Sequence, residues 1–509
     1  MLLQIRAVLK TNDEYSSEMD CLVKKSIGTI TAKNGTILKI SSLKGEGRWR
    51  QMKIVKRNRE GAEITGNIGD TGSAGSLGSP RNGGSAGNPR MGLSRCILLL
   101  LAAALLLGAA GCAFAKASDT TDLTEGISAS NDVAARRADA EFINSAADFS
   151  IDLFKESITG SKNSLVSPLS VMLALAMTAN GADGETLSQM EALLGGSIPL
   201  DMLNEYLYSY ANSLPNAEKS KMKIANSIWF RGDEEKLKLK PEFLQKNADY
   251  YDAAAYSAAF DNQTVKDINS WVEKNTDGMI DKMLEEITGD AMLYLINAIV
   301  FDAEWQSVYF KENVRKEVFT DISSLTNSID FMYSTEYGYL DDGMATGFIK
   351  PYAGGGYSFA ALLPNEDVAI EAYVESLTGE RFLDVINNAQ KDLMVFASMP
   401  KFEYDYEKKM KDALIALGMP DAFDPDAADF NKMGRSSYGN LFIDMVLHKT
   451  FISVDELGTK AGAVTMVAMS GGGSGASDYE TVHLNRPFVY AIIDNATNLP
   501  IFIGTLMTV

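Results

Sequence analysis

The sequence predicts one large α+β domain over residues 140–509, preceded by three segments that do not belong to it. Segments with helical apolar spacing and segments with strand composition follow one another without regular alternation. That order favours a mixed architecture over a doubly wound parallel sheet. Apolar residues make up 46% of the 509-residue chain and charged residues 22%, a balance that is typical of globular proteins and not of disordered ones.

Three predicted helices open the domain. Apolar residues recur at helical spacing over residues 142–154, which predicts an amphipathic helix. The run over residues 163–177 is apolar nearly all round, so we expect a buried helix with Pro168 in its first turn, where the missing N–H is tolerated. Residues 181–190 indicate a helix end followed by a capped restart.

Strand composition dominates the middle of the domain. A further amphipathic helix, over residues 268–280, carries Trp271 on its apolar face. Helices and strands are therefore interleaved within the same stretch of chain. The predicted strands cover residues 222–230, 292–301, 357–363 and 393–402.

Residues 91–111 have the composition of a secretory signal peptide. Met91 and Arg95 precede an almost unbroken apolar run over residues 96–110, and small residues follow where a signal peptidase would cut. A buried core helix is the alternative, but the run lacks the cap and the polar face of such a helix. We therefore expect export with translation starting at Met91, and residues 1–90 as a low-complexity leader or an upstream artefact.

Two cleavage sites remain open. Residues 109–112 resemble a bacterial lipobox, which would make Cys112 a lipidated first residue, whereas residues 113–115 suit ordinary signal peptidase. A lipid on Cys112 would be the only attachment to a membrane. Residues 112–139 are polar, lack apolar periodicity and predict a flexible tether. The predicted location is extracellular or at the cell surface.

The charge distribution excludes nucleic acid as a partner. Residues 1–90 hold 15 Lys and Arg against 8 Asp and Glu, whereas the residues after Ala115 hold 31 against 59, a net charge of −28. Binding to phosphates depends on Lys and Arg, so this acidic body repels them. Cys21, Cys96 and Cys112 all precede the domain, which has only two histidines; we therefore expect no disulfide, no metal site and no cofactor.

The domain carries a series of short motifs. They are Gly184 and Thr186; Asn269 and Trp271; Asn297, Phe301 and Trp305; Met-Pro-Lys-Phe at residues 399–402; Leu-Gly-Met at residues 417–419; His448 and Lys449; Glu456, Gly458 and Thr459; and Asn-Arg-Pro-Phe at residues 485–488. In these motifs and their spacing, the chain from about residue 140 onward resembles the serpins, of an exported bacterial type. The resemblance implies a monomeric domain of three β-sheets and eight or nine helices, which inhibits a serine protease.

The segment after residue 454 has the composition of a strand that can enter a sheet. Alternate residues share one face of an extended chain, and on one face all of them are small and uncharged, whereas Lys460 lies on the other. Burying the small face costs little free energy. The resemblance implies that this segment is the hinge of a reactive loop, which inserts into the large sheet after cleavage. The hinge residues are Glu456, Gly458, Thr459, Ala461, Ala463 and Thr465.

The glycine-rich residues 470–477 predict an exposed tip that a protease can reach. Family spacing counted forward from Glu456 places the cut near Gly472, and counted backward from Pro487 near Ala476; we favour residues 472–474. A small residue before the cut suits elastase-like or subtilisin-like proteases and not trypsin-like ones. The candidates for the reactive site are Gly472, Gly473, Ser474, Gly475 and Ala476.

The resemblance also implies two supporting sites. Ser167, Ser170, Asn297 and His448 match the shutter, a hydrogen-bonded cluster that governs opening of the large sheet, and Trp305 matches the breach at its top. Two other functions compete with protease inhibition. A Ser/His/Asp hydrolase is disfavoured because the Gly-x-Ser-x-Gly motif does not occur within residues 140–509, where a nucleophile would be needed. The serious rival is a non-inhibitory serpin that acts as a binding protein on the cell surface.

Overall fold

The computed structural model describes residues 120–232, 235–280, 282–287, 291–459 and 478–509, together with four strands nearer the N-terminus. The chain forms two compact units, residues Met1–Gly111 and Cys112–Val509. The predicted signal peptide and Cys112 lie outside the described residues. In the first unit an antiparallel sheet, which the sequence analysis does not predict, comprises β1 (Gly28–Thr31), β2 (Ile37–Gly45), β3 (Arg48–Arg57) and β4 (Glu63–Asn67), in that order.

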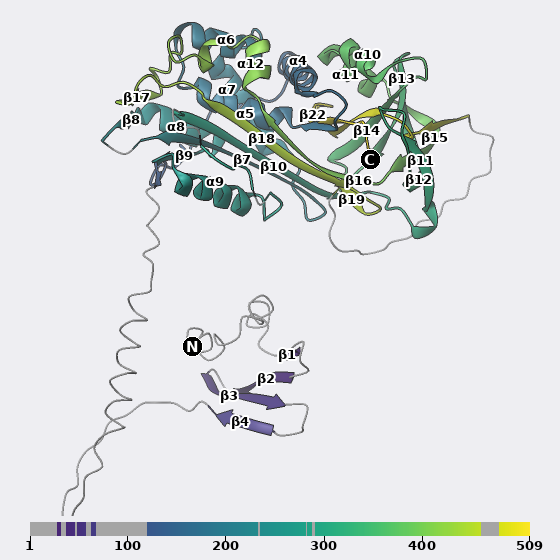
Figure 1. Ribbon diagram of the computed structural model, residues 1–509, viewed down its shortest axis with the longest axis horizontal. Helices are drawn as coiled ribbons and strands as arrows, with labels where there is room; N and C mark the ends of the chain where they lie inside the picture. The colour runs from purple at the N-terminus through teal and green to yellow at the C-terminus, as the bar shows by residue number, and fades with distance from the viewer. Residues whose placement is uncertain are drawn as a thin grey trace, which may run out of the picture. The chain divides into compact units, whose positions relative to one another are not determined.

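A seven-stranded sheet runs through the second unit (Figure 1). Five of its strands are long enough to form the body of the sheet, and two contribute only two residues each. Strands β10 and β7 pair antiparallel over eleven residue pairs and form the centre of the sheet. In spatial order the strands are β16 (Phe402–Lys409), β18 (Met445–Val454), β19 (Gly458–Thr459), β10 (Leu293–Glu304), β7 (Ser220–Arg231), β9 (Ala254–Ala258) and β5 (Thr121–Asp122).

A nine-stranded sheet divides in two at its longest strand, β12 (Thr326–Asp341). Most of β12 pairs with β11 and β15, while its end, after a bulge near Tyr339, pairs with β13. The two halves and the seven-stranded sheet are the three sheets that the sequence analysis expects. The remaining strands are β11 (Val314–Thr320), β15 (Gln390–Pro400), β20 (Tyr479–His483), β13 (Ala345–Pro351), β14 (Tyr357–Pro364), β21 (Phe488–Asp494), β22 (Pro500–Leu506) and β6 (Ser164–Val166); β8 (Leu237–Leu239) and β17 (Gly434–Ser436) form a separate pair.

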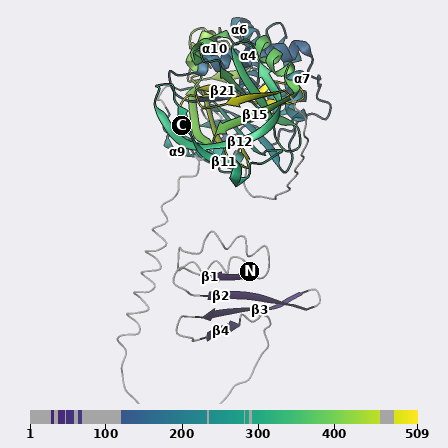
Figure 2. The same cartoon turned by 90° about the vertical axis from the view of Figure 1, so that its right-hand side faces the viewer.

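Helices cover both faces of the seven-stranded sheet (Figures 1 and 2). Leu293 and Leu295 of β10 belong to the large core on the α5 side, whereas Tyr294 and Ile296 pack with α9 on the other. Burial on both faces explains why this strand is an unbroken apolar run. The helices of the described second unit are α4 (Ala140–Ser157), α5 (Pro168–Ala179), α6 (Gly184–Gly195), α7 (Leu200–Ser213), α8 (Pro241–Tyr251), α9 (Asn262–Asn275), α10 (Ile370–Ser376), α11 (Gly379–Asn387) and α12 (Lys411–Ala416).

Three predicted boundaries are wrong. The second helix begins only at Pro168, because residues 164–166 pair with β22 as strand β6. The helix expected over residues 268–280 is α9, which starts earlier because the Asp261 side chain caps the N–H groups of Gln263 and Thr264. The strand expected to end at Phe402 ends at Pro400, and Phe402 begins β16 in the other sheet.

The segment predicted as a flexible tether is held on the domain from Thr120 onward, which corrects that prediction. Strand β5 pairs with β9 at the edge of the seven-stranded sheet. Further along, Ser130 N donates to Asp249 Oδ1 at 2.7 Å, and the Arg136 side chain pairs with Glu205. Polar composition misled the prediction because these contacts use backbone groups and charged side chains and not an apolar face. Among the described helices, none is long and apolar enough to span a membrane.

Candidate functional site

The seven-stranded sheet forks between its strands β10 and β18. These strands pair in parallel from Tyr294 and Met445 to Ala298 and Lys449. Beyond that point the short strand β19 lies between them and is antiparallel to both. Thr459 pairs with Ala303 on one side and with Val454 on the other. The start of the predicted hinge is therefore already a strand of the sheet.

Close packing explains why glycine and threonine occupy β19. A Cβ atom on Gly458 would lie 2.0 Å from the carbonyl oxygen of Ala303, so no side chain fits there. Thr459 is only 2% exposed, and its hydroxyl lies 2.5 Å from the hydroxyl of Tyr352. This places the first residue of the predicted inserting face in the interior. Ala461, Ala463, Thr465 and the reactive-site candidates lie outside the described residues.

The turn before β19 is bound to a segment that follows β10. Trp305 N donates to Leu457 O at 2.8 Å, and Trp305 Nε1 donates to Asp455 O at 2.9 Å. Tyr309 N donates to Glu456 O at 2.9 Å. Trp305 is buried and stacks on Tyr352, with ring centroids 4.5 Å apart. The predicted breach residue therefore binds the base of the loop directly, through both of its N–H groups.

The side chain of Glu456 forms an ion pair with Lys401, which lies between β15 and β16. Both side chains are 30% exposed, so solvent weakens the attraction and the pair contributes little free energy. Its value is positional, because it fixes the hinge to the end of β15 in the other sheet.

The four predicted shutter residues lie together beneath the fork. His448 Nδ1 lies 2.7 Å from Asn297 Oδ1, and His448 Nε2 accepts a hydrogen bond from Ser167 N at 3.0 Å. Asn297 Nδ2 lies 2.6 Å from the carbonyl oxygen of Ser170 and 2.5 Å from its hydroxyl. Because Asn297 is on β10 and His448 on β18, this network joins the two strands on either side of the fork.

Asn226, which the sequence analysis missed, also belongs to this network. It lies opposite Asn297 on β7 and accepts a hydrogen bond from Asn297 Nδ2 at 2.6 Å. A polar residue in the middle of a predicted strand was the available signal. Ser167, by contrast, contributes its backbone N–H, and its buried hydroxyl has no hydrogen-bond partner among the described residues.

Burial fixes the charge state of His448. Desolvation lowers its pKa from 6.5 to about 3, so the ring is neutral at physiological pH. Since Nε2 accepts from Ser167 N, the proton is on Nδ1 and is donated to Asn297 Oδ1. A protonated ring would direct a second N–H at the N–H of Ser167, which would break the network.

Known proteins resemble this chain over most of the domain. A family model described as Serpin (serine protease inhibitor) matches residues 144–509. The chain belongs to the serpin family. It is 30% identical to human Serpin B3 over 382 residues, which cover 70% of this chain and 96% of that protein, and 32% identical to human Neuroserpin over 379 residues, which cover 71% and 90%.

Solved structures of serpins share the fold. Crystal structures of Tengpin, a thermophilic serpin, in the native and the latent state are 54% and 52% identical to this serpin. Their TM-scores are 0.74 and 0.66, and the matches cover 77% and 74% of this chain and all of the other. The predicted serpin fold is thus confirmed, and the family is one of protease inhibitors and not of enzymes.

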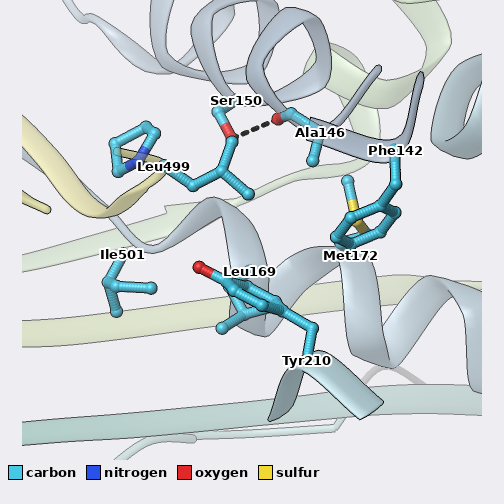
Figure 3. A pocket seen from close by; sticks show the side chains of 9 residues that line it. Phe142, Ala146, Ser150, Leu169, Met172, Tyr210, Leu499 and Ile501 are labelled. Carbon is cyan, nitrogen blue, oxygen red and sulfur yellow. Dashed lines mark hydrogen bonds between the residues drawn. The ribbon is translucent and has the colours of Figure 1, made fainter. Parts of the chain in front are cut away.

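The described residues of this serpin form a small cavity and a wider, open pocket. The wider pocket is lined by residues of α4 and α6 and by Leu417 and Gly418, and its volume is about 610 Å³. The cavity in Figure 3 lies between α4, α5, α7 and β22, and its volume is about 10 Å³, room for roughly one water molecule. Its lining is largely apolar, as Phe142 and Met172 illustrate, and Ser150 Oγ donates to Ala146 O. Within the described ranges, no group of three or more His, Cys, Asp and Glu residues could hold a metal ion.

Among the described residues, the contact that most resembles the Ser–His pair of a hydrolase joins Ser398 Oγ and His483 Nδ1. Ser398 is a buried residue of β15, so a substrate cannot reach its hydroxyl. The other histidine, His448, is bound within the shutter. Among the described residues, neither histidine contacts an exposed serine hydroxyl.

Proposed function

We propose that this serpin inhibits a serine protease as a suicide substrate, and that its loop enters the fork between β10 and β18 after cleavage. The observation that carries the proposal is strand β19. Thr459 is buried and paired on both sides, so the first step of insertion is already made in the uncleaved protein. Each later step would extend the same antiparallel pairing down the sheet.

The proposed reaction begins as ordinary proteolysis. The serine hydroxyl of the protease attacks the carbonyl carbon of the residue before the cut, the peptide C–N bond breaks, and the new amino group leaves with the proton. The residue then remains joined to the protease as an ester. Gly472 lies thirteen positions after Thr459. At about 3.3 Å per residue, the inserted strand would carry the protease roughly 45 Å along the sheet before water hydrolyses the ester.

The target we propose has a shallow specificity pocket, as in elastase-like or subtilisin-like proteases. All five reactive-site candidates, Gly472 to Ala476, are Gly, Ser or Ala. Such residues leave a deep acidic pocket of the trypsin type unfilled and its charge unpaired. The choice between the candidates depends on the length of strand that must enter before the ester is hydrolysed.

We further propose that the protein is an exported serpin of bacterial type, acting as a monomer outside the cell or on its surface. Residues 91–111 support export, and Cys112 at the end of that segment supports a lipid anchor. The net charge of −28 after Ala115 repels nucleic acid, which agrees with a protein that does not bind it.

A non-inhibitory binding protein is the second candidate. The small residues of the predicted inserting face, Thr459, Ala461, Ala463 and Thr465, favour inhibition, because bulky or charged residues there would resist burial.

Incubation with elastase and with subtilisin tests the proposal, with trypsin as the control. We expect an SDS-stable complex with elastase or subtilisin, and mass spectrometry of that complex should locate the cleaved bond within residues 472–476. Loop cleavage by every protease without any such complex would support the binding protein instead.

A further inference from the structure

A buried ion pair lies directly behind the base of the loop. Lys350 on β13 and Glu336 on β12 have side chains only 1% and 8% exposed, and Lys350 Nζ lies 2.6 Å from Glu336 Oε1. Neither residue belongs to the hinge, the shutter or the breach as the sequence defines them. Removing two charges from water is costly, and a buried pair rarely stabilises a fold more than apolar residues of the same size would. Its presence therefore calls for a role other than stability.

The ammonium group of Lys350 binds the segment that holds the hinge. Its Nζ donates to Ser307 O at 3.1 Å. It also lies 4.3 Å from the centre of the Tyr309 ring and 5.4 Å from that of the Trp305 ring, where the negative faces of aromatic rings attract a cation. One cation thus contacts three residues of the segment 305–309, while Glu336 fixes the cation to β12.

The same segment supplies the hydrogen bonds to the turn before β19. Trp305 and Tyr309 donate to the carbonyl groups of residues 455–457. Lys350 therefore acts on the hinge indirectly: it contacts the rings of Trp305 and Tyr309, and the N–H groups of these two residues bind the turn. A shift of the segment 305–309 would move the base of the loop with it.

We propose that Lys350, paired with Glu336, is a positioning residue that sets the barrier to loop entry by fixing Trp305 and Tyr309 against the hinge. The proposal rests on the proposed insertion of the loop into the fork. In this proposal the ion pair controls the rate of loop entry, and this role is separate from any contribution to the stability of the fold. The pair is charged because only a cation can bind two ring faces and a carbonyl oxygen at once.

Two variants separate positioning from stability. Lys350→Met alone leaves the Glu336 carboxylate buried without its partner, so the protein should unfold at lower denaturant concentration. The double variant Lys350→Met with Glu336→Met replaces the pair by apolar side chains of similar length and should recover most of that loss. It still lacks the cation that holds Trp305 and Tyr309.

The control is Arg381→Met, which breaks a partly buried ion pair elsewhere in the domain. Arg381 Nη2 lies 3.1 Å from Asp342 Oδ2, and the two side chains are 27% and 6% exposed. Asp342 keeps a hydrogen bond from the Tyr373 hydroxyl at 3.1 Å. This variant loses stability without touching the segment 305–309.

The measurement is the rate at which the uncleaved protein takes up a synthetic peptide of residues 459–472, alongside the midpoint of denaturant unfolding. We expect the double variant to take up the peptide at least about tenfold faster than the wild type and than Arg381→Met, a change of about 1.4 kcal/mol in the barrier. Equal uptake by the double variant and either reference protein would overturn the proposal. Peptide uptake needs no protease, so failure to form a covalent complex would refute suicide inhibition and leave this test intact.

Discussion

Replacing Thr459 by arginine should convert this serpin from an inhibitor into a substrate. Thr459 is 2% exposed, its backbone pairs with Ala303 and Val454, and its hydroxyl lies beside that of Tyr352. In Thr459→Arg the hydrogen bond to Tyr352 is lost, at a cost of about 1 kcal/mol. An unpaired guanidinium in the same space would cost about 3–5 kcal/mol more. The cheaper response is for the two residues of β19 to leave the fork.

Expulsion of β19 stops insertion at its first step. A barrier raised by about 3 kcal/mol slows insertion more than about a hundredfold, and water then hydrolyses the ester before the protease is carried along the sheet. The global fold should persist, because β19 contributes only two residues to the sheet. The expected result is cleaved serpin and active protease where the wild type gives a covalent complex.

Titration of elastase with each protein measures this effect. The number of serpin molecules consumed per protease inhibited should rise from near one to about ten or more in Thr459→Arg, in line with a tenfold change for each 1.4 kcal/mol. Thr459→Ser, which keeps the hydroxyl beside Tyr352, is the matched control and should titrate like the wild type. Covalent complex at the wild-type ratio in Thr459→Arg would refute burial of this residue as a condition for inhibition.

Two further predictions concern the shutter and the fork. The folded-state pKa of His448 is about 3 and the unfolded value is near 6.5, so the unfolded chain binds the extra proton first and stability falls as the pH drops below 6.5. Unfolding free energies should be about 2 kcal/mol lower at pH 5 than at pH 7.5, and a His448→Gln variant that keeps the same pH slope would contradict this. Gly458→Ala places a Cβ 2.0 Å from Ala303 O, so elastase titration should show more substrate turnover; an unchanged ratio would mean that β19 tolerates the methyl group.

The sequence could predict the fold because each element carries a local signal. Pro168 at the first turn of α5 and the unbroken apolar run of β10 are readable from neighbouring residues alone. The predictions that were wrong concern elements whose pairing partners lie far along the chain. Strand β6 looked helical because its partner β22 lies more than 300 residues away.

The functional network shows the same limit at the level of single residues. The resemblance to the serpins pointed to Asn297 and His448, and the structure places Asn297 Oδ1 2.7 Å from His448 Nδ1 although 151 positions separate the two residues. The resemblance did not predict that Ser167 contributes its backbone N–H and not its hydroxyl. The burial of Lys350 and Glu336 could not be predicted for a different reason: charged residues in a strand ordinarily indicate a solvent-facing side.

The direction of the proposed motion follows from the pairing in the fork. Strands β10 and β18 share a single parallel interface of five residue pairs, and His448 and Asn297 join them near the end of this interface that faces the fork. A strand that enters between them removes this interface and makes two, and β19 shows that both would be antiparallel. Antiparallel pairing is slightly more stable per residue than parallel pairing. The proposed insertion would therefore gain backbone hydrogen bonds once the shutter opens. On this proposal, the uncleaved state persists because of a barrier at the shutter and the breach, and not because it is the most stable arrangement of the chain.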